Sequence, residues 1–141
     1  MKNFFGKIKE SFKKATTPKD GKGKVKFDDG ATYDGEWKNH EIHGHGTYIW
    51  KDGRTYTGQW VNGKQHGKGT DTFPDGTIYE GEWKNGKKHG KGKMIFSKID
   101  DDAILISKYE NDTPVGKCNF TFADGSTEEG EHINGKYVPK K

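Results

Sequence analysis

The sequence predicts an all-β fold, in which repeated β-hairpins form an elongated single antiparallel sheet, with an N-terminal amphipathic α-helix. Three observations predict it. A motif of aromatic residues and glycines recurs through most of the chain, Asn-Gly and Asp-Gly turns separate its short runs, and the first residues carry apolar side chains at helical spacing. Short copies of this kind bury little surface alone and are stabilised by packing on their neighbours.

The composition is unusual for a folded domain. Hydrophobic residues make up 28% of the 141 residues and charged residues 33%, a balance that in an irregular sequence favours disorder. However, the 21 glycines and the aromatic residues, 13% of the chain, are regularly spaced. Regular spacing indicates a repeat fold.

The net charge of +4 is concentrated at the N-terminus. Residues 1–27 hold nine Lys against Glu10 and Asp20, a balance of +7, and the rest of the chain balances at −3. A surface for nucleic acid is therefore not expected, because the body of the protein would repel phosphate. Cys118 is alone, so the chain has no internal disulfide. The longest apolar run, residues 103–106, is far shorter than the roughly 20 residues of a membrane span.

The repeat begins with Tyr-x-Gly-x-Trp at residues 33–37, 56–60 and 79–83, so the period is 23 residues. A Gly-x-Gly follows each time, and Asp-Gly ends the first two copies. The predicted organisation is a helix over 1–16, a linker over 17–20, a repeat sheet over 21–136 and a tail over 137–141. Within the sheet we assign a half repeat 21–32, repeats 33–55, 56–78 and 79–104, and degenerate copies 105–127 and 128–136.

Each copy contains two runs separated by turn dipeptides, which predicts a hairpin. In the second copy Tyr56, Gly58 and Trp60 share one face of their strand, because side chains alternate along a strand. Gly67 and Gly69 share one face of the next strand. If these are the same face of the sheet, large rings cover strand glycines. The opposite face is then a solvated face of paired charges.

Together, Tyr-x-Gly-x-Trp and the following Gly-x-Gly resemble the MORN (membrane occupation and recognition nexus) repeat over roughly residues 21–136. The resemblance is strongest in the second and third copies and weakest from Leu105 onward. It implies a single twisted, elongated sheet whose concave aromatic face often receives a partner peptide or helix.

We expect a partner-binding groove on the aromatic face, because a single sheet has nothing behind its apolar side and part of the rings should stay accessible. The alternative is that the rings, with Phe27 and Phe122 in the same ladder, are only the thin core of the repeat. The predicted partner is a protein or peptide, with a helix and a second copy of the chain both left open. The predicted groove residues are Tyr33, Trp37, Trp50, Tyr56, Trp60, Phe73, Tyr79, Trp83 and Phe96.

The N-terminal segment, wound as a helix, has one apolar face and one basic face. Three readings remain open: contact with an anionic membrane surface, a cap or dock on the protein's own sheet, and binding of a helical partner. The apolar side holds Phe4, Phe5, Ile8 and Phe12, and the basic side holds Lys2, Lys9 and Lys13.

No metal, cofactor or catalytic centre is expected. His43, His66 and His89 recur at the repeat period, but equivalent positions lie two strands apart, roughly 9.5 Å, too far to share one ion. The recurrent polar residues follow the repeat symmetry, whereas catalysis needs a unique constellation. The sequence therefore predicts a non-catalytic adaptor or scaffold, or alternatively a peripheral membrane tether. We expect it in the cytoplasm, with the cytoplasmic membrane face left open.

Overall fold

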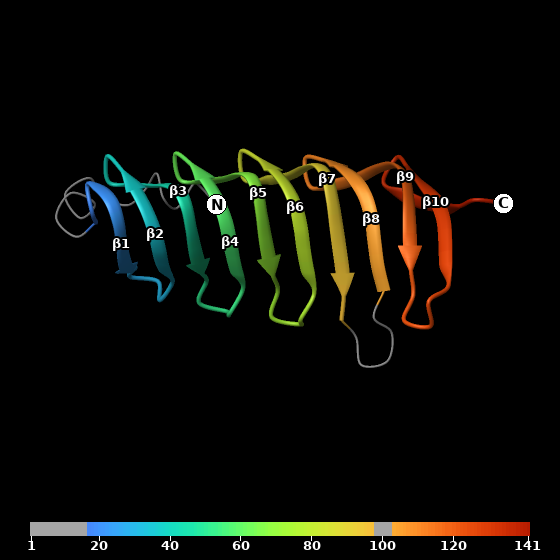
Figure 1. The fold of residues 1–141 in the computed structure, drawn as a ribbon, viewed down its shortest axis with the longest axis horizontal. Helices are drawn as coiled ribbons and strands as arrows, with labels where there is room; N and C mark the ends of the chain where they lie inside the picture. The colour runs from blue at the N-terminus through green and yellow to red at the C-terminus, as the bar shows by residue number, and fades with distance from the viewer. Residues whose placement is uncertain (1–16, 98–102) are drawn as a thin grey trace.

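A computed structural model describes residues 17–97 and 103–141, and these residues form one open antiparallel sheet of 11 strands. The strands lie in the sheet in the order in which they occur in the chain, so every neighbouring pair is a hairpin (Figure 1). The prediction of a single sheet of repeated hairpins is confirmed. The predicted helix over 1–16 lies outside the described residues, and none of the described residues is helical.

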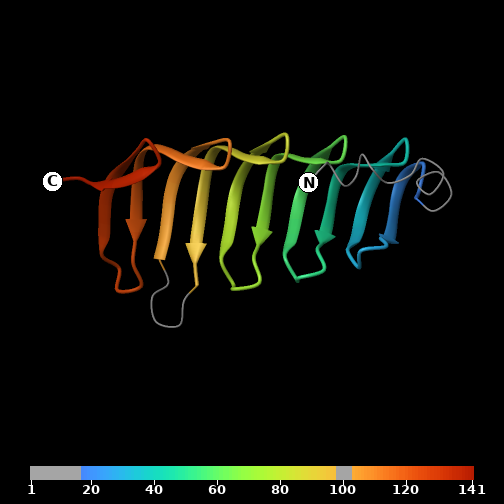
Figure 2. The ribbon, with the colours of Figure 1, turned by 180° about the vertical axis from the view of Figure 1, so that it is seen from behind.

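The strands are short and similar in length, as a repeat of hairpins requires. Figure 2 shows the same succession from behind. The strands are β1 Asp20–Lys26, β2 Thr32–Lys38, β3 Glu41–Ile49, β4 Thr55–Val61, β5 Lys64–Thr72, β6 Ile78–Lys84, β7 Lys87–Phe96, β8 Ala103–Glu110, β9 Thr113–Thr121, β10 Thr127–Ile133 and β11 Lys136–Pro139.

Two kinds of turn alternate along the sheet. The upper turns in Figure 1 have both central residues at positive φ, as at Asn62 (48°) and Gly63 (78°), the geometry that Asn-Gly favours. The lower turns end in a glycine such as Gly53 (φ 99°), and the Asp52 carboxylate accepts a 2.9 Å hydrogen bond from the Arg54 amide. Both turn types repeat along the chain, which explains why its hairpins are nearly identical.

A bulge interrupts four of the upper hairpins, those of β2 with β3, β4 with β5, β6 with β7 and β8 with β9. The pairing of β4 with β5 shifts register between Gly58 and Trp60, and Gly67, on the bulged strand, has a φ of 70°. A bulge bends its strand, and the left-handed φ explains the first glycine of Gly-x-Gly. The strands consequently bend at their upper ends towards the upper turns (Figures 1 and 2).

The second glycine of Gly-x-Gly has a different role. Gly58, Gly69 and Gly81 face one another across three strands. A Cβ on Gly69 would overlap the phenol of Tyr56, which lies directly over that glycine. The same row crosses the sheet from β1 to β7 at Gly23, Gly35, Gly46, Gly58, Gly69, Gly81 and Gly92. This glycine row lets the tyrosine rings lie against the backbone.

No helix of the described residues has the length and apolar character that a membrane crossing requires.

We expect Gly69→Ala to lower the free energy of unfolding by about 1–3 kcal/mol, because the added methyl group must displace the Tyr56 ring. Urea denaturation followed by tryptophan fluorescence measures the change. Lys68→Ala, one residue away on the opposite face and exposed, is the control and should stay within about 0.5 kcal/mol. Equal losses for both variants would contradict the close contact of ring and glycine.

Candidate partner-binding surface

The tyrosines and tryptophans of the repeat form one continuous ladder of edge-to-face rings. Tyr56 lies between Trp60 of its own copy, at 5.0 Å, and Trp83 of the next, at 5.2 Å, with interplanar angles of 79° and 89°. Perpendicular rings at this separation attract one another. The ladder runs through Trp37, Tyr33, Trp60, Tyr56, Trp83, Tyr79 and Tyr109. Each ring therefore joins one copy to the next.

The polar groups of these rings are bonded within the fold. The Tyr56 hydroxyl donates to the carbonyl of Gln59 at 3.0 Å, and Trp60 Nε1 donates to the carbonyl of Gly46 at 3.1 Å. The first and third copies repeat both bonds. Burial raises the pKa of Tyr56 and its equivalents above the ordinary range, and that of Tyr109 to about 12. From Trp37 to Tyr79 the ladder is a satisfied core, whereas the buried Tyr109 hydroxyl at its end has no hydrogen-bond partner among the described residues.

The structure therefore changes the predicted groove. The expectation that its rings stay partly accessible is wrong for six of them, since Tyr33, Trp37, Tyr56, Trp60, Tyr79 and Trp83 are all 5% exposed or less. The reason is the bend at each bulge together with the glycine row, which let one sheet enclose its own rings. Trp60→Ala and Trp83→Ala would consequently test stability and not binding.

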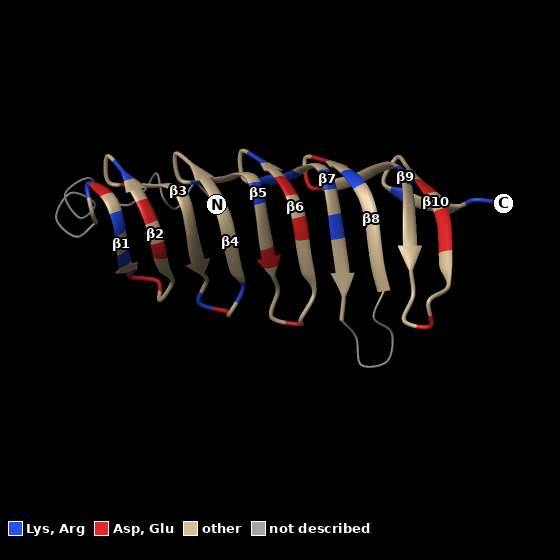
Figure 3. Cartoon of the chain, in the orientation of Figure 1, with Lys and Arg blue, Asp and Glu red and all other residues tan. Residues whose placement is uncertain are grey.

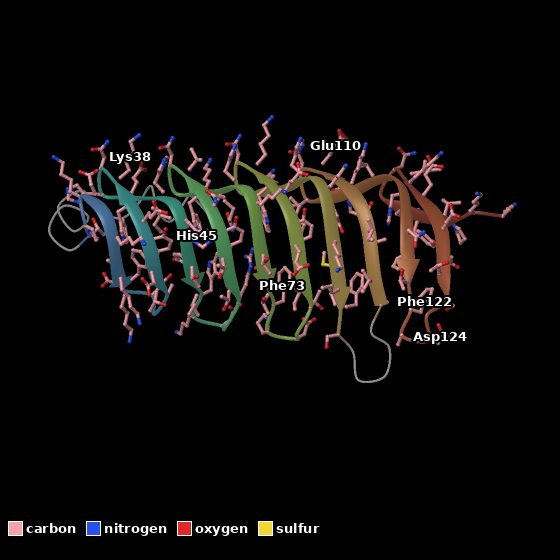
Figure 4. All side chains as sticks on the ribbon, viewed as in Figure 1. Lys38, His45, Phe73, Glu110, Phe122 and Asp124 are labelled. Carbon is pink, nitrogen blue, oxygen red and sulfur yellow. The ribbon has the colours of Figure 1, made fainter. Side chains whose placement is uncertain are left out.

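The other three predicted groove residues, Trp50, Phe73 and Phe96, are half-buried. They precede the lower turns at one position of the repeat, which also holds Phe27, buried, and Phe122, 37% exposed. We call Trp50, Phe73 and Phe96 the rim. Figure 4 shows Phe73 and Phe122 at the lower end of the strands, near the lower turns. The rim is the accessible part of the predicted groove.

A buried ion pair lies between two residues of the rim. The Asp71 carboxylate has no exposed surface, and Arg54 binds it through two nitrogens, with Nε at 2.9 Å from Oδ1 and Nη2 at 2.6 Å from Oδ2. The guanidinium centre lies 4.2 Å from the Trp50 ring centroid and 5.4 Å from that of Phe73. Cations are attracted to aromatic faces at these distances. Arg54 thereby fixes two of the three rings of the rim.

Lys88 is a second cation beside the rim, as Arg54 is beside Trp50 and Phe73. Its ammonium lies 6.0 Å from the Phe73 centroid and 5.5 Å from that of Tyr79, and its side chain is 15% exposed. The partner carboxylate of Asp112, at 3.9 Å, is about half exposed. The region around Phe73 therefore combines aromatic surface with two cations.

The remaining candidate residues are the recurrent histidines, the cysteine and the residues of the predicted helix. The described residues contain no group of three His, Cys, Asp or Glu side chains that could hold a metal ion. His43 Nδ1 accepts a 3.4 Å bond from the Asn62 amide. Cys118 is buried opposite Gly130, and burial raises the pKa of its thiol. The candidate helix residues Phe4, Phe5, Ile8 and Phe12 lie outside the described residues.

The MORN repeat model matches residues 33–53, 56–78, 79–98 and 107–127, more than half of the chain. The chain belongs to the MORN repeat family. The resemblance found in the sequence is thus confirmed. No curated protein matches the chain. MORN repeats are consistent with a repeat protein that interacts with proteins or membranes.

Sequence reasoning missed the ion pair, although a signal was present. Arg54 occupies the repeat position of Ala31, and Asp71 occupies that of Tyr48, 17 residues later in both copies. The two departures from the repeat occur together and carry opposite charges. Such a paired departure indicates contact between the two positions.

We expect Arg54→Ala to lower the free energy of unfolding by about 3–5 kcal/mol, because it leaves the Asp71 carboxylate buried without its cation. The double variant Arg54→Ala/Asp71→Tyr, which installs the residues of the first copy, should recover most of the loss. Urea denaturation measures both. Lys51→Ala, exposed beside the same turn, should change stability by less than about 0.5 kcal/mol. A double variant no more stable than Arg54→Ala would contradict this account of the pair.

Proposed function

We propose that this MORN repeat protein is a non-catalytic scaffold that binds an amphipathic helix of a protein partner along its rim. The observation that carries the proposal is the regular row of half-buried rings at Trp50, Phe73 and Phe96, on a sheet whose tyrosine and tryptophan ladder is enclosed. Partly exposed aromatic side chains held rigidly in place are the commonest anchors of protein interfaces. Arg54 contacts two of these rings, Trp50 and Phe73, and holds them in position.

The spacing of the rim favours a helical partner. Successive rim residues lie two strands apart, which is roughly 9.6 Å at a strand separation of about 4.8 Å. A helix rises about 1.5 Å per residue, so side chains seven residues apart are separated by about 10.5 Å along it. A helix with one apolar residue in every seven could therefore place one side chain on each ring.

The charge of the rim favours an acidic residue beside each apolar one. Arg54 keeps 30% of its side chain exposed, and Asp71 occupies two of its nitrogens. Lys88 adds a second cation near Phe73. A carboxylate on the partner could bind the exposed edge of the Arg54 guanidinium, since arginine offers five donors. We therefore expect the helix to carry Asp or Glu next to its apolar positions.

The test is selection of helical peptides from a displayed library on the full chain. We expect enriched peptides to carry apolar residues seven positions apart with acidic neighbours. Their affinity for Trp50→Ala/Phe73→Ala should fall at least tenfold, because each lost ring removes about 1 kcal/mol or more of binding energy. Fluorescence anisotropy with labelled peptide gives the dissociation constants.

The matched control is Ile49→Ala/Thr72→Ala, which changes the adjacent residue on each strand and points to the opposite face. Circular dichroism establishes that both double variants remain folded. Peptides that bind the rim variant as tightly as the unchanged chain would exclude the rim as the binding site.

The N-terminal sequence supports a second proposal, peripheral attachment to an anionic membrane at the cytoplasmic face. Residues 1–27 carry a charge of +7, and Phe4, Phe5, Ile8 and Phe12 lie on one side of the predicted helix. Each lysine near an anionic surface adds about 1 kcal/mol, and a short amphipathic helix binds reversibly. The repeats would then present the rim at the membrane.

Flotation with anionic liposomes tests the membrane proposal. We expect the full chain to float and Phe5→Glu/Phe12→Glu to remain with the soluble fraction. Lys22→Ala/Lys24→Ala, which lowers the charge of the same region without changing the apolar side, should weaken flotation less than the glutamate variant does. A full chain that does not float would exclude the tether.

A further inference from the structure

On the solvent face, opposite to the aromatic ladder, the first copies pair unlike side chains. Lys22 faces Glu36, and Lys68 faces Glu82, directly across neighbouring strands. The two variable positions of Tyr-x-Gly-x-Trp hold Asp34 and Glu36, Thr57 and Gln59, and Glu80 and Glu82 in the three copies. Both positions are therefore acidic or neutral and polar, and they balance lysines on adjacent strands.

The fourth copy breaks this pattern at both positions. Ile106 stands where the other copies have Asp34, Thr57 and Glu80, and it is 54% exposed. Lys108 stands at the position of Glu36, Gln59 and Glu82, and it faces Lys91 directly on β7. Like charges opposite each other destabilise a sheet by a few tenths of a kcal/mol or more. An exposed isoleucine beside uncompensated lysines offers no evident gain to the fold.

Neither lysine of the Lys91–Lys108 pair forms a salt bridge within the described residues. The salt bridges formed among the described residues involve Arg54, Lys88 and Lys140, and not Lys91 or Lys108. On the far side of β8, Lys108 faces Val115. Figure 3 shows basic segments on both β7 and β8. The repulsion between Lys91 and Lys108 is therefore not relieved by a salt bridge among the described residues, although Glu80 and Glu82 line the hollow beside Lys91.

Apolar side chains continue from Ile106 along the same face. Ile78, Ile95 and Ile104 face one another across three strands, and all three are half-buried. Upward from them, a hollow of about 700 Å³ extends over β3 to β7, and its charged lining residues are Lys68, Lys91, Glu80 and Glu82. The surface thus combines an apolar strip, a lysine pair and a hollow.

We propose that the solvent face of β7 and β8, around Lys91, Ile106 and Lys108, docks an acidic protein segment that carries an apolar side chain. The carboxylates would bind the lysine pair, and the apolar side chain would cover Ile106. A protein segment fits better than a lipid bilayer, because side chains can enter the hollow beside Lys91 and a flat bilayer cannot. This surface lies on the face opposite to the rim, so it is a second binding surface and does not depend on the proposed function.

The decisive variant is Ile106→Glu/Lys108→Glu, which restores the acidic residues of the third copy. Random peptides are displayed and selected on the full chain, and enriched sequences are synthesised. We expect acidic peptides with an apolar residue, whose affinity falls at least tenfold in the variant and weakens with added salt. The urea midpoint of the variant should stay equal or rise, because the residue at position 108 would then pair with Lys91. Weaker binding by a chain that is no less stable identifies a surface kept for docking.

The control Lys38→Glu/Asn39→Asp makes the same change in net charge at a distant upper turn, and it should leave peptide affinity unchanged. If the first variant fails to fold, Lys91→Glu, which places unlike charges opposite each other on β7 and β8, must show the same loss. Three results would overturn the proposal. They are no enrichment of acidic peptides, unchanged peptide affinity in a folded variant, and a variant that loses binding to anionic liposomes while its peptide affinity stays the same. Selected peptides that depend on Trp50 and Phe73 but not on Ile106 belong to the rim.

Discussion

The contact between a tyrosine ring and a strand glycine is the constraint on which the rest of this structure depends. Only a residue without a Cβ lets the Tyr56 phenol lie on the backbone of the neighbouring strand, as at Gly69. The phenol can then reach the Gln59 carbonyl, and its ring meets Trp60 and Trp83 edge to face. A sheet one layer thick therefore buries large rings without a second layer. The core is repeated in each hairpin because the contact is repeated.

The same constraint limits which surfaces are free for binding. Since the ladder from Trp37 to Tyr79 uses its hydroxyl and indole groups internally, these rings have little left to offer a partner. The contact between tyrosine and glycine does not restrict the residues next to the ladder, and at those positions the copies differ. The rim keeps a ring at Trp50 and Phe73, but the residue between these rings, Arg54, is an alanine in the preceding copy. On the solvent face the charged residues differ from copy to copy. Function in such a repeat is expected at the variable positions that flank an invariant core.

Much of the fold could be predicted because the repeat period, the turn dipeptides and the alternation of side chains along each strand are all visible in short stretches of sequence. Asn-Gly fixed the upper turns, and the spacing of Tyr56, Gly58 and Trp60 placed ring and glycine on one face. The bulge could not be predicted, because Gly67 and Gly69 look alike in sequence. One of them provides a left-handed φ, and the other provides space for a ring. Without the bulge, the enclosure of the rings was also invisible, so the predicted groove was too wide. Of the predicted groove only the rim stays accessible, because its rings lie at the lower ends of the strands, away from the bend that encloses the ladder.

The departures from the repeat separate into two kinds, and the distinction carries the functional argument. Arg54 and Asp71 depart together, meet at 2.6 Å and cancel each other's charge, so the exchange is complete within the chain. Ile106 and Lys108 also depart together, but both changes point to solvent, and Lys108 meets Lys91 instead of an acid. A degenerate copy that served only to end the sheet would have no reason to put an apolar and a basic side chain where the other copies have acidic or neutral polar residues. A departure that is not balanced inside the molecule is most simply balanced by something outside it.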